Sequence, residues 1–390
     1  MDFVMPQPPF FFYGSLQAPE LLSIVAGRPA ETLELTPATL DGFAAVHVLD
    51  EAFPCLVERE GAAAQGAIMA ARDEAEAARL VFFEDEEEFE LRPVAVRTAD
   101  GAVEAQAFFP RARLAPGPDW SYEDWRNTDR PLMLECAAEI MALYEQGVDW
   151  SDLSMWPGIK NRARARVRAG RENAARAEGA PPVGAEAVME NPPRRAVTET
   201  LTRPYASYFG IEAMEVRHET FGGGLSAPLT RAAFVSGDAV TVLPYDPARD
   251  EVLLIAQWRA GPHARGDAHP WPLEVIAGRL DADESAEAAA RREALEEAGL
   301  ELDAVEPVGG YYPSPGVMAE HITSYIAVAD LSEAGGVHGL EEEGEDIAAI
   351  RLGFDEAMAL LDRGAVNSAT AMISLLQLAR RREALREAAG

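Results

Sequence analysis

Three glutamates in the final third of the chain have the spacing of one helix face. Glu293, Glu296 and Glu297 occupy positions i, i+3 and i+4, and the alanine-rich sequence around them favours a helix. Carboxylates on a shared face repel each other, so such a face is either solvated or occupied by a cation. Oxygen ligands of this type suit Mg²⁺, with Mn²⁺ as a second possibility. The spacing therefore predicts either an acidic surface helix or a divalent-metal site.

Both ends of this helix are marked in the sequence as well. Asp283, Glu284 and Ser285 precede it, where a capping side chain and negative charge are favourable. Gly299 follows it and is well placed to end the helix, because glycine adopts the left-handed conformation that helix ends often need. We therefore expect the helix to lie within the segment 278–300.

The whole segment from Gly278 to Leu300 resembles the Nudix box. That motif is a glycine, five residues, a glutamate, seven residues and then R-E-U-x-E-E-x-G-U, where U is aliphatic. Ala294 is a soft departure, since it is a small residue at an aliphatic position. Nudix proteins hydrolyse nucleoside diphosphates linked to another group, with divalent metal on this helix, and the resemblance implies the same here. The matching residues are Gly278, Glu284, Arg292, Glu293, Glu296, Glu297, Gly299 and Leu300.

The sequence on either side of the box is similar to that of the ADP-ribose pyrophosphatase group. A proline about fifteen residues past the box marks that group, and Pro315 stands there. The resemblance implies that Arg259 contacts the diphosphate and nucleotide and that Glu320 helps to hold the ribose. It also implies that an acidic loop completes the site, with Glu343 and Glu345 as its base and its metal-associated carboxylate. The alternative is that this loop is simply solvated.

The resemblance also implies a mechanism and a cofactor. A water acidified by Mg²⁺ or Mn²⁺ would be deprotonated by Glu343 or Glu345 and attack phosphorus, giving AMP and ribose 5-phosphate from ADP-ribose or a related ADP-sugar. Arg292 is expected to be an ion-pair partner, and a homodimer is expected because dimers are usual in this group. Val235-Ser236 stands where relatives have a more charged pair of residues. The residues that contact the base of the nucleotide are therefore not predicted. The implied metal ligands are Glu293, Glu296, Glu297 and the carbonyl of Ala277.

The start of the chain has the pattern of a strand, a turn and a helix. The apolar residues Phe10 to Tyr13 favour a strand, and Gly14-Ser15 can turn the chain and cap a following helix. Backbone N–H groups at such a junction can receive a carboxylate or phosphate. The alternative is that the glycine is needed only for steric reasons. The elements expected after it are strands around Val46, Val57 and Ile68, then a helix, then a strand pair with a turn at 99–101.

The order of these segments is similar to that of the γ-glutamylcyclotransferase-like (AIG2-like) family. The resemblance implies that the Tyr-Gly-Ser-Leu loop holds a substrate carboxylate and that Glu84 is the general acid or base. Apolar neighbours such as Phe83 could raise the pKa of Glu84 by desolvation. Phe89 stands where many relatives have tyrosine, and Glu84 begins an acidic run that could be merely solvated, so a non-catalytic sensor or interaction module is the alternative. The loop residues are Tyr13, Gly14, Ser15 and Leu16.

A chain of 390 residues is too long for one ordinary domain, and the two resemblances divide it. We expect an α+β protein of two domains, with a γ-glutamylcyclotransferase-like mixed barrel over 8–148 and a Nudix α/β/α sandwich over 191–388. The stretch 149–190 is predicted to be a helical basic linker. It is either exposed and neutralised by nearby acids or docked on an acidic surface of another domain or subunit. The pairing of domains resembles that of TrgB-type tellurite-resistance proteins, although no residue implies chemistry on tellurite.

Composition narrows the partners. The formal net charge of −32 argues against nucleic acid or an anionic membrane. Cys55 and Cys136 form neither a disulfide framework nor a metal-site spacing, and the chain has no bilayer-spanning apolar stretch and no signal peptide, so a cytoplasmic protein is expected. Three hypotheses follow: an ADP-ribose hydrolase with a helper domain, a bifunctional enzyme that also cleaves γ-glutamyl amides, and a regulatory protein that binds ADP-ribose without turnover. Intact box carboxylates disfavour the third.

Overall fold

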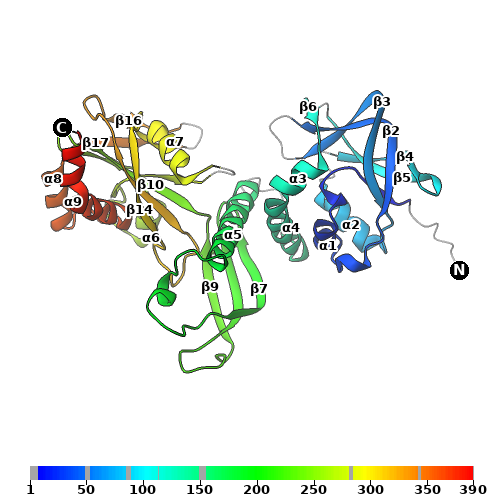
Figure 1. The fold of residues 1–390 in the computed structure, drawn as a ribbon, viewed down its shortest axis with the longest axis horizontal. Helices are drawn as coiled ribbons and strands as arrows, with labels where there is room; N and C mark the ends of the chain where they lie inside the picture. Colours follow the sequence, from blue (N-terminus) through cyan, green and yellow to red (C-terminus); the bar gives the residue numbers. More distant parts are fainter. Residues whose placement is uncertain are drawn as a thin grey trace. The chain divides into compact units, whose positions relative to one another are not determined.

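The computed structural model describes residues 8–48, 53–84, 89–112, 114–148, 155–280, 284–340 and 344–389. The chain divides into two compact units, Met1–Asp152 and Leu153–Gly390. Each unit combines helices with its own sheet (Figure 1), so the predicted α+β fold of two domains is confirmed. No helix of the described residues is long and apolar enough to cross a membrane.

In the described part of the first unit, five strands close into a barrel. The ring runs β3, β1, β5, β4 and β2 and returns to β3, while β6 pairs with the C-terminal end of β2. Strand β1 is parallel to β5 and antiparallel to β3, so the barrel is mixed as predicted. The strands are β1 (Phe10–Phe12), β2 (Thr36–Val48), β3 (Pro54–Met69), β4 (Phe89–Thr98), β5 (Gly101–Pro110) and β6 (Pro116–Asp119).

Strand β3 corrects one prediction, because the residues around Val57 and Ile68 belong to a single strand of 16 residues. The pairing of β2 with β3 shifts register between Asp41 and Phe43. Gly42 and Gly61 both have positive φ at this irregularity, at +84° and +77°. Glycine adopts this conformation without a steric penalty, so the chain forms a bulge and the strand continues.

The Tyr-Gly-Ser-Leu segment also differs from the prediction. Gly14 and Ser15 do not begin an α-helix, because Ser15–Gln17 is a short 3₁₀ helix and α1 begins only at Pro19. Proline is favoured at this first helical position because its fixed φ suits a helix and its missing N–H would be unpaired there. The helices of this unit are α1 (Pro19–Ala26), α2 (Glu74–Phe83), α3 (Tyr122–Thr128) and α4 (Arg130–Glu145).

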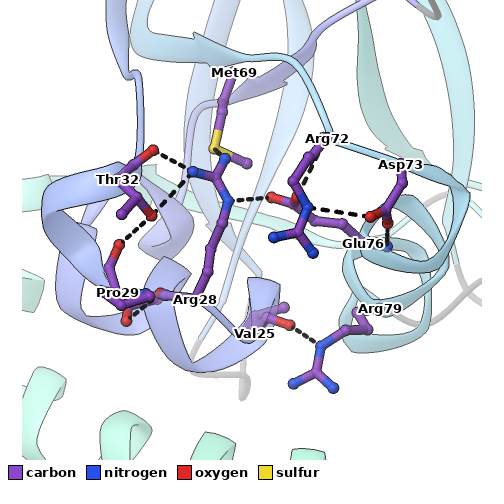
Figure 2. Close-up of polar contacts among 10 residues, drawn as sticks. Val25, Arg28, Pro29, Thr32, Met69, Arg72, Asp73, Glu76 and Arg79 are labelled. Carbon is purple, nitrogen blue, oxygen red and sulfur yellow. Dashed lines mark hydrogen bonds and ion pairs between the residues drawn. The ribbon is translucent and has the colours of Figure 1, made fainter.

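A buried carboxylate joins the ends of α1 and α2 (Figure 2). Glu76 is 2% exposed, and it accepts hydrogen bonds from Arg28 Nε at 2.9 Å and from the backbone N–H of Arg72 at 3.0 Å. Arg79, one turn further along α2, donates from Nε to the carbonyl of Val25 at 2.7 Å. Because the last carbonyls of a helix lack partners within it, Arg79 satisfies the end of α1 and fixes it beside α2.

The second unit is built on an eight-stranded sheet and a separate three-stranded sheet, both counted over the described residues. The order of the large sheet is β14, β15, β10, β11, β17 and β16, with β12 beside β11 and β13 beside β10. Its strands are β10 (Ala239–Asp246), β11 (Glu251–Ala256), β12 (Leu273–Glu274), β13 (Ile276–Arg279), β14 (Ala304–Tyr311), β15 (Ile322–Val328), β16 (Gly336–His338) and β17 (Ile347–Gly353). The helices are α5 (Met155–Ala177), α6 (Ala260–Arg265), α7 (Ala286–Ala298), α8 (Phe354–Asp362) and α9 (Ala369–Ala389).

Apolar cores lie on both faces of the large sheet. Alternate residues of β10 and β11 point to opposite faces, as strand geometry requires. On one face, Val242 and Ile255 share a cluster with the alanines of α7, including Ala290. On the other face, Leu243 shares a cluster with residues of α8 and α9, including Leu375. Figure 1 shows α7 apart from α8 and α9, with the sheet between them, so the predicted α/β/α sandwich is confirmed.

One loop prediction after the box is partly wrong. Residues 308–311 belong to β14, which pairs with β15 through a register shift between Pro307 and Gly309. Gly309 has a φ of +143°, which only glycine adopts readily, so the strand passes through the shift where a loop was expected. Residues 312–316 lie outside the strands as predicted.

The small sheet consists of β7 (Ala196–Ala206), β8 (Gly210–His218) and β9 (Leu229–Val235), in that order. Strand β7 lies at one edge and contains Pro204. Its pairing with β8 shifts register twice, between Thr198 and Thr200 and between Thr202 and Tyr205. Strand β9 ends at the turn that leads into β10 of the large sheet.

Helix α5 carries the basic stretch and belongs to the second unit. Ile159 and Arg162 are 0% and 1% exposed, and Arg162 Nη1 donates to the carbonyl of Ser207 at 3.1 Å. Arg166 and Arg168 form ion pairs with acidic residues of the same unit. The helix is therefore neutralised by nearby acids and buries one side of its first half, while its residues from 169 onward are exposed.

We predict that Asp250 stabilises the second unit through its charge. Its carboxylate pairs with Arg382 and with Arg386 at 2.6 Å and accepts from the hydroxyl of Tyr245 at 2.8 Å; chiefly the Arg382 hydrogen bond lowers its pKa to about 2. Asn is the suitable replacement, because Asp250 has a φ of +60° that Asn tolerates. Asp250→Asn is expected to lower the free energy of unfolding at pH 7 by about 1–2 kcal/mol.

The pH dependence of that difference follows from the sign of the shift. A carboxyl whose pKa is lower in the folded state stabilises the fold above its unfolded pKa, and this contribution is lost as pH falls through the folded pKa. The difference in the free energy of unfolding between wild type and Asp250→Asn, measured with urea, should therefore be largest at pH 7. It should shrink between pH about 4 and about 2. A gap that stays constant down to pH 3 would contradict the ionic explanation.

Candidate active site

The acidic helix α7 begins and ends as its sequence predicts. The side-chain oxygen of Ser285 accepts from the backbone N–H of Ala288 at 3.1 Å, which caps the first turn. Gly299 ends the helix in the left-handed conformation, with a φ of +62°. Small alanines on one side let α7 lie close to the sheet. The glutamates are thereby held beside strand β13.

Glu297 is the most deeply buried of these glutamates, at 2% exposure. Its Oε2 accepts from the backbone N–H of Ala277 at 3.0 Å, and its Oε1 accepts from Gln257 Nε2 at 3.4 Å. Burial, together with the negative charges of Glu293 and Glu345, raises the pKa of Glu297 to about 8. A carboxylate in this setting is held in place by the backbone, and its burial outweighs the effect of the nearby positive charge of Arg259.

Arg292 holds the other carboxylates of the box together. It donates to Glu284 at 3.0 Å, to Glu293 at 2.7 Å and to Glu296 at 3.0 Å, and its Nη2 donates to the carbonyl of Arg279 at 3.0 Å. These contacts are those of the ion-pair partner that the sequence predicts. Burial nevertheless raises the pKa of Glu293 to about 7, because its desolvation outweighs the attraction of Arg292.

Gly278 lies directly against the Glu293 side chain. A Cβ at this position would overlap the carboxylate of Glu293, so no other residue fits without displacing it. Strand β13 is held in register by β10, with Gly278 opposite Val240. The first glycine of the box is therefore required by the close approach of strand and helix.

Two further predicted residues act on the buried carboxylates. Arg259, which precedes α6, lowers the pKa of Glu297 by its charge, and its Nε donates to Glu274 Oε2 at 2.6 Å. Glu345 raises the pKa values of both Glu293 and Glu297, so it faces the same region, and its Oε2 accepts from the backbone N–H of Leu340 at 3.2 Å. The structure thus brings Arg259 and Glu345 to the acidic face of α7.

Glu343 lies outside the described residues, and the remaining predicted residues lie on the segment before β15. Pro315 is exposed. Glu320 is partly buried, and it accepts from the hydroxyl of Ser236 at 3.4 Å. Burial raises the pKa of Glu320, and the positive charge of Arg279 opposes this shift. Ser236, noted in the sequence as an uncharged departure, is the residue that contacts it.

Sequence reasoning missed Gln257 and Glu274. Gln257 is 6% exposed and donates to Glu297, while Glu274 pairs with Arg259. A signal for Gln257 was present, because it is a polar residue directly after the apolar strand β11. Side chains two apart on an extended segment point the same way, so Gln257 could have been assigned to the side of Arg259. Glu274 lies on β12, which pairs with β11, so it is brought beside the same segment as Gln257 and Arg259.

The donor set fits a divalent cation. The Glu293 carboxylate is partly buried and that of Glu297 is buried, and burial together with neighbouring carboxylates, Glu345 among them, raises both pKa values despite the charges of Arg292 and Arg259. A hard cation would offset the negative charge of these carboxylates with ligands that it prefers. Among the described residues, which exclude 341–343, no three acidic, histidine or cysteine side chains already converge as closely as a metal site needs.

The first unit contains a second group of predicted residues. Tyr13 is 6% exposed and its hydroxyl donates to the carbonyl of Phe108 at 2.9 Å. Burial raises the pKa of Glu84 to about 7, and the charge of Glu84 raises the pKa of Tyr13, so the two side chains lie near each other. Leu16 is 1% exposed within the 3₁₀ helix that begins at Ser15, beside Gly14. The loop and the carboxyl are thereby brought together.

Comparison with known proteins gives the class of each unit. Residues 235–373 match the NUDIX domain family, and residues 10–127 match the gamma-glutamyl cyclotransferase, AIG2-like family. The second unit is therefore a Nudix hydrolase domain, and the first is a γ-glutamylcyclotransferase-like domain.

Individual relatives extend this match. The chain is 36% identical over 182 residues to the ADP-ribose pyrophosphatase of Escherichia coli (strain K12), covering 47% of this chain and 87% of that protein. It is 34% identical over 173 residues to the ADP-ribose pyrophosphatase of Haemophilus influenzae, covering 44% and 80%. A GDP-mannose pyrophosphatase of Pectobacterium atrosepticum is 36% identical over 149 residues, covering 37% and 74%. This chain belongs to the Nudix family.

Among solved structures, a crystal structure of an ADP compounds hydrolase aligns with 50% of this chain and 98% of its own, at 18% identity and a TM-score of 0.40.

Proposed function

We propose that the second unit hydrolyses ADP-ribose, or a related ADP-sugar, to AMP and ribose 5-phosphate with Mg²⁺, or alternatively Mn²⁺, as cofactor. The observation that carries this proposal is the pair of carboxylates on one face of α7, Glu293 and Glu297, whose pKa values are raised by burial and by neighbouring carboxylates. Similarity to ADP-ribose pyrophosphatases supports the choice of substrate. Nudix hydrolases generally use divalent metal ions, which supports a divalent cation as cofactor. The choice of Mg²⁺ is part of this proposal.

Each residue of the site has a proposed role. A divalent cation held by Glu293, Glu296, Glu297 and the carbonyl of Ala277 would neutralise the diphosphate and acidify a water. Glu345 is one candidate for the base that takes the proton of that water, because its negative charge raises the pKa values of both Glu293 and Glu297. Glu343 is the other candidate. Gln257 and the Ala277 N–H would keep Glu297 oriented.

The substrate side of the site is proposed to begin at Arg259 and Glu320. A guanidinium suits a diphosphate, because it offers several donors in a fixed plane. Glu320 would accept from ribose hydroxyls, and Pro315 would shape the preceding turn. The pairing of Arg259 with Glu274 at 2.6 Å keeps that guanidinium oriented in the absence of substrate.

The substrate proposal is tested by product release from two nucleotide sugars. The full-length protein with Mg²⁺ is expected to release AMP from ADP-ribose faster than GMP from GDP-mannose, and EDTA is expected to abolish both activities. Chromatography of the nucleotide products measures this directly. Faster GMP release would assign the enzyme to GDP-mannose, the substrate named for the GDP-mannose pyrophosphatase relatives. Binding of ADP-ribose without AMP release would favour the regulatory hypothesis.

A second candidate function concerns the first unit, and a specific observation favours it. Glu84 has a pKa of about 7 and lies near Tyr13, so it can both accept and donate a proton at neutral pH. We propose that this unit converts γ-glutamyl amides to 5-oxoproline and the free amine, with the loop of Gly14, Ser15 and Leu16 holding the substrate carboxylate. A non-catalytic sensor is the alternative.

Glu84→Gln is expected to lower 5-oxoproline release from a γ-glutamyl dipeptide by about a hundredfold or more, because positioned acid–base groups contribute that much. AMP release from ADP-ribose should not change. Glu74→Gln, at an exposed position of α2, is the matched control. If wild type and Glu84→Gln release 5-oxoproline equally slowly, the first unit is not a cyclotransferase.

The homodimer and the cytoplasmic location stay predictions. Sedimentation of the full-length protein measures the first, and a mass of twice 42.1 kDa is the expected result.

A further inference from the structure

The turn between β9 and β10, residues 236–238, is held by three parts of the second unit. Gly237 has a φ of +114°, and a Cβ added there would meet the Cβ and carbonyl oxygen of Asn161 at 3.1 Å. Asn161 belongs to α5, so this helix lies directly against the turn. The neighbouring residues of the turn, Ser236 and Asp238, make contacts of their own, with α5 and with other elements.

Asp238 connects the turn to α5 and to the segment that carries Glu320. Its Oδ2 pairs with Arg168 Nη1 at 3.1 Å, and its Oδ1 accepts from the backbone N–H of His321 at 3.3 Å. The Asp238 side chain is 9% exposed and that of Arg168 is 29% exposed. Burial raises the pKa of Asp238, and Arg168 is the largest opposing influence. Without Arg168, the carboxylate would keep only the weaker influences of His321.

Ser236 connects the same turn to the candidate substrate carboxylate and to the catalytic helix. Its hydroxyl donates to Glu320 at 3.4 Å, and its carbonyl accepts from Arg279 Nη1 at 2.8 Å. The carbonyl of Arg279 in turn accepts from Arg292, the hub of the box carboxylates. A shift of the turn would therefore move Glu320 relative to α7.

We propose that Arg168 and Asp238 are positioning residues for the Nudix reaction, which fix the 236–238 turn and thereby set Glu320 relative to the metal-binding helix. This inference rests on the proposed function, which assigns Glu320 to holding the substrate. It assigns part of the basic helix α5 to the active site, although α5 contributes no group to the chemistry. Small displacements of positioning groups have large effects on reactions, of about a hundredfold per ångström.

The test compares three α5 variants of the full-length protein in the ADP-ribose assay. Arg168→Gln is expected to raise KM about tenfold and to change kcat by less than about threefold, because it disturbs substrate positioning more than the carboxylates of α7. Arg168→Lys should recover part of the loss, since it keeps the charge. Arg166→Gln is the matched control: its partner Glu212, at 2.5 Å, is on β8 and keeps a second pair with Arg203 at 2.9 Å. Its KM should stay within about twofold of wild type.

Asp238→Asn provides an independent variant. Its amide oxygen can still accept from the His321 N–H, so the turn keeps that bond and loses only the ion pair. If the two residues act as a pair, the double variant Arg168→Gln/Asp238→Asn should raise KM no more than the single variant with the larger effect on KM. Multiplied effects, or a KM in Arg168→Gln equal to that of Arg166→Gln, would overturn the inference. Thermal midpoints of all variants separate a positioning effect from unfolding.

The same variants distinguish this inference from the proposed function. If wild type binds ADP-ribose but releases no AMP, the proposed hydrolysis fails, and the inference is then decided by calorimetry. The Kd of ADP-ribose should weaken about tenfold in Arg168→Gln and not in Arg166→Gln. If wild type releases AMP and neither Arg168 nor Asp238 affects KM, the inference alone fails. A protein that neither binds nor hydrolyses ADP-ribose overturns both.

Discussion

Glu297→Gln is expected to lower kcat for AMP release from ADP-ribose by about a thousandfold, with Mg²⁺ present. The substitution keeps the size of the side chain but removes the charge. Its amide oxygen can still accept from the Ala277 N–H, and its amide NH2 group keeps a hydrogen bond with Gln257 only if the Gln257 amide turns to present its oxygen. A neutral amide oxygen is a poor replacement for a carboxylate as a ligand of a divalent cation. Single-turnover and steady-state measurements of AMP release check the prediction.

Unfolding can be excluded as the cause of that loss. The pKa of Glu297 is about 8 in the fold, far above the value of an unperturbed glutamate, so in the metal-free protein its ionisation destabilises the folded state as pH rises from about 4.5 to about 8. At pH 8 and without metal, Glu297→Gln should be at least as stable as wild type. Glu287→Gln, on the exposed side of the same helix, should keep full activity. Activity within tenfold of wild type in Glu297→Gln would exclude Glu297 as an essential metal ligand.

The second large effect is expected from a single methyl group. Gly278→Ala places a Cβ where the Glu293 carboxylate lies, so either strand β13 or the Glu293 side chain must move. Overpacking of this kind costs about 1–3 kcal/mol of stability, and a displaced ligand of about 1 Å can cost a hundredfold in rate. We therefore expect Gly278→Ala to lose about a hundredfold or more in kcat and to lower the thermal midpoint.

Gly353→Ala is the matched control for this substitution. Gly353 has no atoms within 4 Å of an added Cβ and no positive φ, so it should keep both activity and stability within about 0.5 kcal/mol. A crystal structure of Gly278→Ala would show which group moves. If Gly278→Ala is as active as Gly353→Ala, strand and helix do not approach as closely as the structure has them.

The parts of the fold that could be predicted are those fixed by local chemistry. Ser285 and Gly299 bound α7 because a hydroxyl cap and a left-handed glycine act within one turn. The acidic face of that helix follows from the spacing of Glu293 and Glu297 alone. The resemblance to the Nudix box gave Arg292 as an ion-pair partner, and its contacts with Glu293 and Glu296 lie within four residues of it.

The parts that could not be predicted depend on residues far apart in sequence. Arg168 and Asp238 are 70 residues apart, and nothing in the sequence near either residue indicates the other. The length of β3 was misjudged for a related reason. A glycine in a strand can mark either an end or a bulge, and only the pairing of β2 across it shows that Gly61 is a bulge.

The exposed edge of the small sheet has a consequence for solubility. An edge strand presents unpaired N–H and C=O groups that can recruit a strand of another chain, and β7 adds the exposed apolar side chains of Leu201 and Tyr205. Pro204 lies between these two residues and has no N–H to donate. The register shift around it bends the ladder at the same place. Strand β7 is thereby a poor template for intermolecular strand addition, which protects the protein against aggregation along this edge.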